Sequence, residues 1–183
     1  MADALAHAFS DDPVMAWLFP KDPGDRRKRA FFTLQMRRHT IPDSGGYTTE
    51  DFTGAALWAP PDRWRLGPRD VLRDLPSVVR FLGRRFFVAM QGLTLVEKKH
   101  PKQPHWYLAT LGTEPDHQGK GIGSALLAPI LERCDREGLP AYLESSKEQN
   151  LPFYARHGFE VTEQINMPKG PPIWLMWREP RSA

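Results

Sequence analysis

The sequence contains a single cysteine, Cys134, and no run of apolar residues as long as the roughly 18 that a membrane-spanning helix needs. One cysteine excludes an internal disulfide, and Cys134 is expected to pack as a reduced core residue. The N-terminus lacks the basic segment followed by an apolar stretch that is typical of a secretory signal peptide. Repeats and low-complexity linkers are also missing. We therefore expect a cytoplasmic protein whose residues 1–183 form one domain.

Metal-ligand spacing is missing as well. The histidines show no such spacing with Cys134 or with one another, and no metal is predicted; they are His7, His39, His100, His105, His117 and His157. The net charge is only +3, although basic residues cluster at 26–29, at 37–38 and between 63 and 85. Acidic residues are interleaved with them, and no nucleic-acid-binding motif accompanies them. We expect solvated helix faces there, and no nucleic-acid or membrane partner.

Residues 113–124 contain a glycine cluster between an apolar run and a long helical pattern. Gly119, Gly121 and Gly123 alternate with other residues. Glycines let a backbone approach a ligand closely, and the following helix directs free N–H groups and its positive dipole end into the same space. The segment is therefore predicted to bind phosphate, with Lys120 adding positive charge.

The spacing of the cluster separates the kinds of phosphate loop. A P-loop requires Gly-Lys followed by Ser or Thr, but Gly119-Lys120 is followed by glycine. A dinucleotide fingerprint, G-x-G-x-x-G, would use Gly119 and Gly121 but finds Ser124 at its third position, with Glu144 near the place of the ribose-binding acid. The glycines also come late in the chain, whereas a Rossmann unit places them after its first strand. A dinucleotide-binding oxidoreductase remains an alternative.

A third pattern, Gln/Arg-x-x-Gly-x-Gly/Ala, is satisfied by Gln118, Gly121 and Gly123. It is the coenzyme A pyrophosphate loop of the GNAT N-acetyltransferase superfamily, which this chain resembles, and most of all puromycin N-acetyltransferase and its relatives. The resemblance runs from Trp106 to about Glu179. It is carried further by Trp106-Tyr-Leu-Ala-Thr-Leu-Gly-Thr113, Ala141-Tyr-Leu-Glu-Ser-Ser146, Asn150-Leu-Pro-Phe-Tyr154 and His157-Gly-Phe159, with upstream support from Ala8-Phe-Ser-Asp-Asp-Pro13 and Gly54-Ala-Ala-Leu-Trp58.

Hydrophobic periodicity predicts the order of the elements. Helices are expected over 4–19 with an interruption at 11–13, over 26–39, and over 68–97 with a break at Pro76 and weak points at Gly83 and Gly92. A turn at 42–46 and a hairpin over 47–59 separate them. A strand at 105–113, a helix at 121–137 capped by Gly138, a strand at 141–145, a helix at 152–157 and a hairpin over 161–178 follow.

The resemblance implies an α/β fold, with a mixed, mostly antiparallel sheet flanked by helices. Residues 1–100 would form the acceptor side and residues 105–179 the acetyl-CoA-binding core. GNAT chains normally open with a strand, whereas this sequence begins inside the first helix, so the first strand is expected to be missing. An edge left open in this way could be covered in a homodimer.

Gly112 interrupts the predicted strand at 105–113. Glycine inside a strand is typical of a bulge or of a close approach by another backbone, and we expect a bulge. In the family the matching strand splays from its neighbour at this point. The resemblance implies that the pantetheine arm pairs with backbone groups at the positions of Leu111 and Thr113.

The resemblance also implies the binding and catalytic residues. The pyrophosphate would be held by residues of the loop, namely Gln118, Gly119, Lys120, Gly121, Gly123 and Ser124. Asn150 matches the residue that hydrogen-bonds the pantetheine arm, and Tyr154 matches the tyrosine that faces the coenzyme sulfur and protonates the departing thiolate. The base is not given by the resemblance. Glu144 is the candidate because it is a carboxylate at the end of the strand expected beside the cofactor strand, with a purely structural role as the alternative; His105 and Glu114 are further candidates.

The function expected from this resemblance is acetyl-CoA-dependent N-acetylation by direct transfer, without a metal. The acceptor is expected to be a primary amine of a small molecule, with antibiotics and aminonucleosides as candidates. Acceptor pockets in the family are made by the first two helices and by the segment that corresponds to 60–99. A CoA-binding regulatory module without catalysis is an alternative besides the oxidoreductase.

Overall fold

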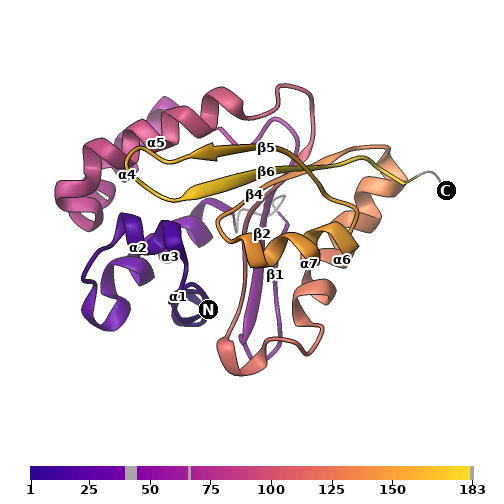
Figure 1. Cartoon of the computed structure of the whole chain (residues 1–183), viewed down its shortest axis with the longest axis horizontal. Helices are drawn as coiled ribbons and strands as arrows, with labels where there is room; N and C mark the ends of the chain where they lie inside the picture. The colour runs from indigo at the N-terminus through magenta and orange to yellow at the C-terminus, as the bar shows by residue number, and fades with distance from the viewer. Residues whose placement is uncertain (40–44, 66, 182–183) are drawn as a thin grey trace.

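An open, six-stranded sheet runs through the computed structural model, which describes residues 1–39, 45–65 and 67–181 (Figure 1). The strand order is β1-β2-β3-β4-β6-β5, and every neighbouring pair is antiparallel except β3 and β4. The strands are β1 (Gly46–Thr48), β2 (Gly54–Ala59), β3 (Trp106–Thr113), β4 (Ala141–Ser145), β5 (Glu160–Asn166) and β6 (Pro172–Arg178). The predicted mixed, mostly antiparallel sheet is confirmed. The turn predicted at 42–46 falls largely outside the described residues.

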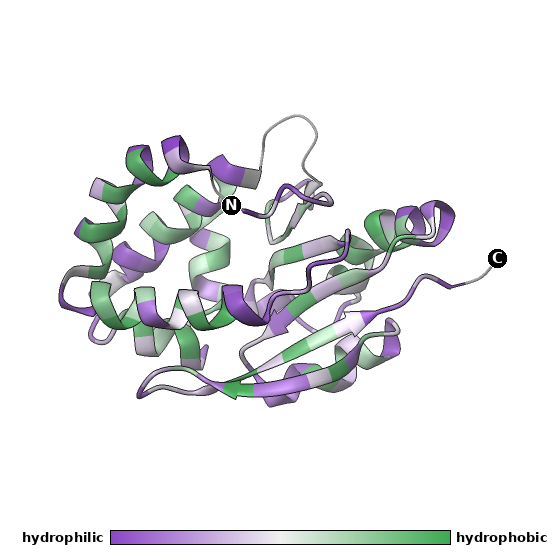
Figure 2. Ribbon diagram, turned by 90° about the horizontal axis from the view of Figure 1, so that it is seen from above, coloured by the Kyte–Doolittle hydropathy of each residue, from purple (hydrophilic) through white to green (hydrophobic). Residues whose placement is uncertain are grey.

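Helices cover both faces of this sheet. The first face carries α1 (Ala2–Ala8), α2 (Pro13–Leu18), α3 (Arg26–His39), α4 (Pro68–Leu82) and α5 (Phe86–Lys99), and the second carries α6 (Ile122–Glu137) and α7 (Leu151–Arg156). Hydrophobic and hydrophilic residues alternate along the helices, as expected for elements with one buried side (Figure 2). Among the described residues, no helix is both long and apolar enough to cross a bilayer.

Strand β2 shows why the core lies on both sides of the sheet. Ala56 and Trp58 pack into the cluster formed with α6, whereas Ala55 and Leu57 pack into the cluster formed with the N-terminal helices. All of its residues are buried. A strand covered on both faces reads as a continuous apolar run, which is what this segment shows.

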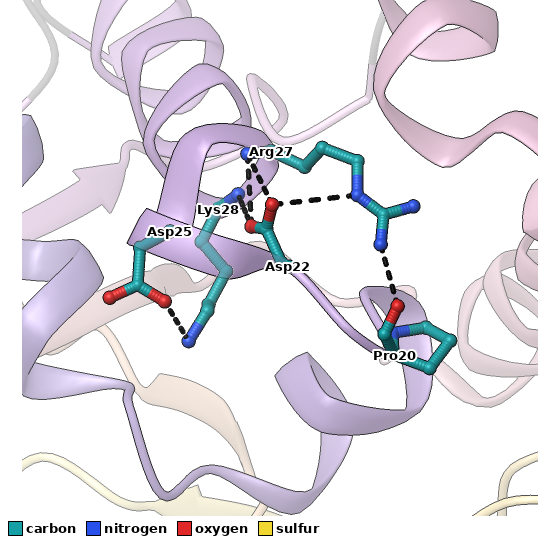
Figure 3. A network of polar contacts seen from close by, with 5 residues as sticks. All are labelled: Pro20, Asp22, Asp25, Arg27 and Lys28. Atoms are coloured by element: carbon teal, nitrogen blue, oxygen red, sulfur yellow. Dashed lines mark hydrogen bonds and ion pairs between the residues drawn. The ribbon is translucent and has the colours of Figure 1, made fainter.

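The start of α3 is fixed by Asp22. Its carboxylate accepts hydrogen bonds from the backbone N–H groups of Arg27 and Lys28, at 2.9 Å and 3.0 Å (Figure 3). The guanidinium of Arg27 donates to the carbonyl of Pro20 at 2.8 Å, and Lys28 pairs with Asp25. Two of the free N–H groups at this end of α3 are thereby paired, which ties the helix to the loop before it.

The break predicted at Pro76 is wrong, because α4 continues through this residue to Leu82. Proline removes the hydrogen bond to the carbonyl four residues earlier, which belongs to Leu72. Leu72 is 73% exposed, so water can reach that part of the helix. The helix instead ends at Gly83, whose φ of +52° favours glycine.

The bulge predicted at Gly112 is also misplaced. In the pairing with β2, Leu57 lies opposite Thr110 and Trp58 opposite Leu108, so the extra residue is Ala109. Gly112 pairs regularly, and its reason is the close approach of α1: a Cβ there would lie 2.9 Å from Leu5. Side chains, and not another backbone, thus occupy the space that a side chain at position 112 would need.

Cys134 lies on the buried side of α6, packs into the core cluster and is fully buried. Burial raises the pKa of its thiol to about 12. The thiol therefore stays protonated at neutral pH. The predicted place of Cys134 in the core is confirmed.

Arg178→Met is expected to lower the free energy of unfolding at neutral pH by about 2–3 kcal/mol. Arg178 is 2% exposed and donates to the His157 carbonyl at 2.9 Å and to the Asp135 carboxylate at 2.8 Å. The hydrogen bond from Arg178 lowers the pKa of Asp135. A carboxylate with a lowered folded-state pKa stabilises the fold above its unfolded-state pKa and loses this effect as the pH falls through the folded-state value. Urea unfolding should show that the loss of free energy of unfolding in Arg178→Met is smaller below about pH 4 than at neutral pH. If the loss were the same at both pH values, the ion pair with Asp135 would not be its cause.

Candidate functional site

A cavity of about 370 Å³ opens where β3 and β4 separate. Its walls come from β3, the loop after it, the first turn of α6, the end of β4, α7 and the end of α1. Eight of the predicted site residues line it: Leu111, Thr113, Gln118, Gly119, Gly123, Glu144, Asn150 and Tyr154. The structure thus brings together residues that are up to 43 positions apart, from Leu111 to Tyr154.

The gap between the two strands leaves backbone groups of β3 unpaired on one side. Strands β3 and β4 pair only from Trp106 to Leu108, opposite residues 141–143. On the other side, the N–H of Glu114 donates to the carbonyl of Thr53 in the turn before β2. Peptide groups alternate in direction along an antiparallel strand, so those of Leu111 and Thr113 point away from β2 and toward the cavity. The Thr113 carbonyl already accepts a hydrogen bond from the Gln118 side chain, so an extended ligand in the gap would pair mainly with the remaining groups, as a strand does.

The loop after β3 leaves an open helix end beside this gap. Gly119 and Gly121 have φ values of +75° and +83°, and a Cβ at either position would meet no atom within 4 Å. Helix α6 starts directly after Gly121 without a side-chain cap, and Ala125 donates to the Gly121 carbonyl at 3.0 Å. The N–H groups of the first helical turn are therefore available to an anion. This fits the pyrophosphate of coenzyme A.

Polar side chains of the loop have partners within the protein. Gln118 donates from Nε2 to the Thr113 carbonyl at 3.1 Å and braces the loop against β3. The hydroxyl of Ser124 lies 2.9 Å from Nε2 of His157. Lys120 is exposed, and Lys120, Gly121 and Ser124 are outside the cavity lining. Anion binding at this end would thus rest mainly on backbone amides.

Tyr154 and Asn150 face the same cavity from α7. Tyr154 is 8% exposed, and burial raises the pKa of its hydroxyl, with a smaller contribution from the charge of Asp12. The hydroxyl therefore stays protonated at neutral pH, as a proton donor must. Asn150 occupies the position before α7, but its side chain makes no capping hydrogen bond. Its amide is free of the structural role that the position alone would suggest.

Sequence reasoning missed Asp12 as part of this site. Asp12 is 2% exposed, caps α2 by accepting from Met15 N–H at 2.8 Å, and lines the cavity. Its other oxygen accepts a hydrogen bond from Ser146, just after β4. Burial raises the pKa of Asp12, against the lowering effect of these hydrogen bonds. The capping pattern Asp12-Pro13 signalled the residue, but nothing in the sequence placed it beside Ser146.

Glu144 lies on the side of β4 that faces the N-terminal helices. Its carboxylate faces the ring of His100, with Oε1 at 3.5 Å from Nδ1, and its side chain is 12% exposed. Burial raises the pKa of the Tyr107 and Tyr142 hydroxyls, and the charge of Glu144 raises it further. The Glu144 carboxyl group thus lies in a largely aromatic setting at the cavity wall.

The other candidate bases are placed differently. His105 is buried beside His100 and reaches Glu144 only through it. Glu114 faces His7 at 3.5 Å and does not line the cavity. Among the described residues, no group of three or more His, Cys, Asp or Glu side chains is arranged to hold a metal ion.

Comparison with known proteins gives consistent matches. Residues 47–159 match the Acetyltransferase (GNAT) family. An uncharacterized N-acetyltransferase of Schizosaccharomyces pombe is 33% identical, over 99% of this chain and 79% of its own length. The crystal structure of a histone acetyltransferase HPA2 and related acetyltransferase from Corynebacterium glutamicum superposes with a TM-score of 0.70 at 30% identity, over 100% of this chain and 90% of that one. An agmatine N-acetyltransferase shares the fold with a TM-score of 0.66 at 13% identity, over 98% and 92% of the two chains.

Proposed function

Because the chain belongs to the GNAT acetyltransferase family, we propose that it transfers an acetyl group from acetyl-CoA to a primary amine of a small molecule. The observation that carries this proposal is the cavity at the β3–β4 gap. It joins an open helix end for the pyrophosphate, unpaired strand groups for the pantetheine arm, and two groups suited to proton transfer, Tyr154 and Glu144.

In the proposed reaction the acceptor enters as an ammonium ion. Glu144 takes one proton from it, and the freed nitrogen lone pair attacks the thioester carbon. The C–N bond forms, the C–S bond then breaks, and Tyr154 donates its hydroxyl proton to the departing thiolate. The second proton of the nitrogen returns to the Tyr154 phenolate, directly or through water, and the proton on Glu144 leaves to solvent. The products are the acetamide, the thiol and one released proton.

Charge at the cavity favours a cationic acceptor. Both acids near its inner wall, Asp12 and Glu144, are buried or nearly so, although the chain as a whole carries a net charge of +3. Asp12 has both oxygens engaged in hydrogen bonds, so Glu144 is the acid left to meet an ammonium group. The acceptor would approach from the side of α4, α5 and the loop before α4.

The proposal is tested by turnover of acetyl-CoA across a panel of amines, polyamines, aminonucleosides and peptides, with release of the coenzyme thiol as the signal. Turnover with at least one small amine is expected. Binding of acetyl-CoA without turnover across the panel would favour the regulatory module. Stabilisation by NAD(P)H but not by acetyl-CoA would favour the oxidoreductase, since a ligand at 100 times its Kd raises the free energy of unfolding by about 2.7 kcal/mol.

Trp64→Ala is expected to raise KM for the amine by about 3- to 10-fold and to leave KM for acetyl-CoA nearly unchanged. Trp64 stacks on His100 with ring centroids 3.6 Å apart, and His100 in turn faces Glu144. Phe87→Ala is the control, because Phe87 is an aromatic residue of α5 that is 78% exposed. If Trp64→Ala changed KM for acetyl-CoA and not KM for the amine, the assignment of the Trp64–His100 side to the acceptor would be wrong.

A further inference from the structure

Behind Glu144, two buried histidines form a chain of ring nitrogens that the proposed reaction does not use. His105 Nδ1 lies 2.7 Å from the Gln103 carbonyl oxygen, and its Nε2 lies 3.0 Å from Nε2 of His100. Nδ1 of His100 then faces Oε1 of Glu144 at 3.5 Å. His100 and His105 are 5% and 1% exposed, so water has little access to this chain.

The positions of the protons along this chain follow from the hydrogen-bonding groups. A carbonyl oxygen only accepts, so Nδ1 of His105 carries a hydrogen and, in the neutral ring, Nε2 of His105 is an acceptor. The contact between the two Nε2 atoms then requires the hydrogen on His100. Neutral His100 therefore turns an unprotonated Nδ1 toward Glu144. Two acceptors face each other there until one proton enters between them.

The surroundings favour a neutral His105 and enclose the ring of His100. Burial lowers the pKa of His105, which therefore stays neutral and fixes the orientation of His100. The ring of His100 is enclosed by Trp64, Tyr107 and Tyr142. The ionisable groups that act on this cluster from neighbouring elements are Tyr107 on β3, Tyr142 on β4, Asp62 before α4, and Glu163 on β5, which is paired with Lys99 of α5 at 2.6 Å.

We propose that His100, held in one tautomer by His105, is a positioning residue that shares a single proton with Glu144 and so strengthens Glu144 as the base. The inference rests on the proposed function for its role in catalysis. When Glu144 takes a proton from the acceptor ammonium, an N–H bond breaks and an O–H bond forms. The new O–H group of Glu144 then donates to Nδ1 of His100. This hydrogen bond stabilises protonated Glu144, whereas an unprotonated Nδ1 has no hydrogen to donate to the Glu144 carboxylate. The proton leaves to solvent before the next turnover.

The kinetic test uses His100→Phe, which keeps an aromatic ring between Trp64 and the tyrosines but removes both nitrogens. We expect kcat to fall by about 100-fold with little change in KM for acetyl-CoA. The acid limb of the kcat/KM profile should move to lower pH, because Glu144 then holds a proton less readily. Trp177→Phe is the matched control, since Trp177 packs against His105 without joining the chain of ring nitrogens. This substitution should leave both kcat and the acid limb of the kcat/KM profile unchanged. A normal kcat and an unmoved acid limb in His100→Phe would overturn the proposal.

A second test needs neither turnover nor a folded His100 variant. In ¹⁵N- and ¹³C-labelled wild-type protein, His100 Nδ1 and the Glu144 carboxyl carbon should titrate with one common midpoint, while His105 stays neutral. In Glu144→Gln the amide N–H can donate to Nδ1, so the transition of His100 should move away from that midpoint. Separate midpoints in the wild type, or an unchanged His100 transition in Glu144→Gln, would show that no proton is shared. A common midpoint in a protein that acetylates no amine would leave proton sharing intact and refute the proposed function instead.

Discussion

Tyr154→Phe is expected to lower kcat by about 10²- to 10⁴-fold while the affinity for acetyl-CoA changes little. The substitution keeps the ring, which packs in the core cluster against Phe153 and Phe159, and removes only the hydroxyl. Within the described chain no hydrogen bond to protein occupies that hydroxyl, and burial raises its pKa. Its loss should therefore affect the departing thiolate rather than the fold.

The measurement for Tyr154 is steady-state kinetics with the best amine of the panel, paired with a calorimetric titration of the same variant. A single-turnover experiment shows whether chemistry or product release limits the rate. Near-normal chemistry in Tyr154→Phe would remove this residue as the acid. A parallel fall in affinity and kcat would indicate that Tyr154 positions the cosubstrate instead.

Gly121→Val is expected to weaken acetyl-CoA binding by about 100-fold, which corresponds to the loss of one or two charge-assisted hydrogen bonds. Its φ of +83° is accessible to glycine but strained for a β-branched residue, so the backbone should turn away and misdirect the amides of the first helical turn. A Cβ would meet no protein atom within 4 Å, so the added bulk enters the space beside the loop rather than the core.

Gly138→Val provides the matched control for Gly121. Gly138 lies at the other end of α6 with a φ of +64°, and a Cβ at this position would likewise meet no atom within 4 Å. Both substitutions should cost about 1–3 kcal/mol of stability, as residues forced into this conformation do, but only Gly121→Val should reduce affinity. Equal affinities of the two folded variants, measured by calorimetry, would remove the loop as the pyrophosphate site.

Elements that depend on local pattern were predictable from the sequence. The helix expected over 26–39 has those bounds in the structure, and the strand expected over 141–145 does as well. The end of α6 at Gly138 followed from glycine being able to take a left-handed conformation. Phosphate-loop spacing likewise led to the family, because glycine positions report directly on backbone geometry.

Features set by distant contacts were not predictable in the same way. The bulge falls at Ala109 because β3 must change the face it presents: Leu108 and Leu111 both pack toward α6, which strict alternation would forbid. Gly112 responds instead to the approach of α1. The periodicity of a single strand indicates neither the position of the bulge nor the contact of Gly112 with α1.

The candidate site shows the same division. Tyr154 was predicted through the family, and Glu144 from its residue type and its place at the end of a predicted strand; both line one cavity in the structure. Asp12 lies in a segment that resembles the family but to which no role was assigned, and His100 lies outside every motif. Their positions depend on the docking of α2 and of the segment after α5 against β4. Long-range packing of this kind leaves no local signal in the sequence.

The seam between β3 and β4 has a consequence for how the molecule holds together. Only three residue pairs and the hydrogen bond from Trp106 N–H to the Pro140 carbonyl join these two strands in the described part of the chain. The sheet thus consists of two three-stranded halves, β1-β2-β3 and β4-β6-β5, which are joined only along this short stretch. A cosubstrate bound along the open stretch would act as a seventh, borrowed strand. While bound, such a cosubstrate would be part of the sheet, and each turnover would remove and replace that part.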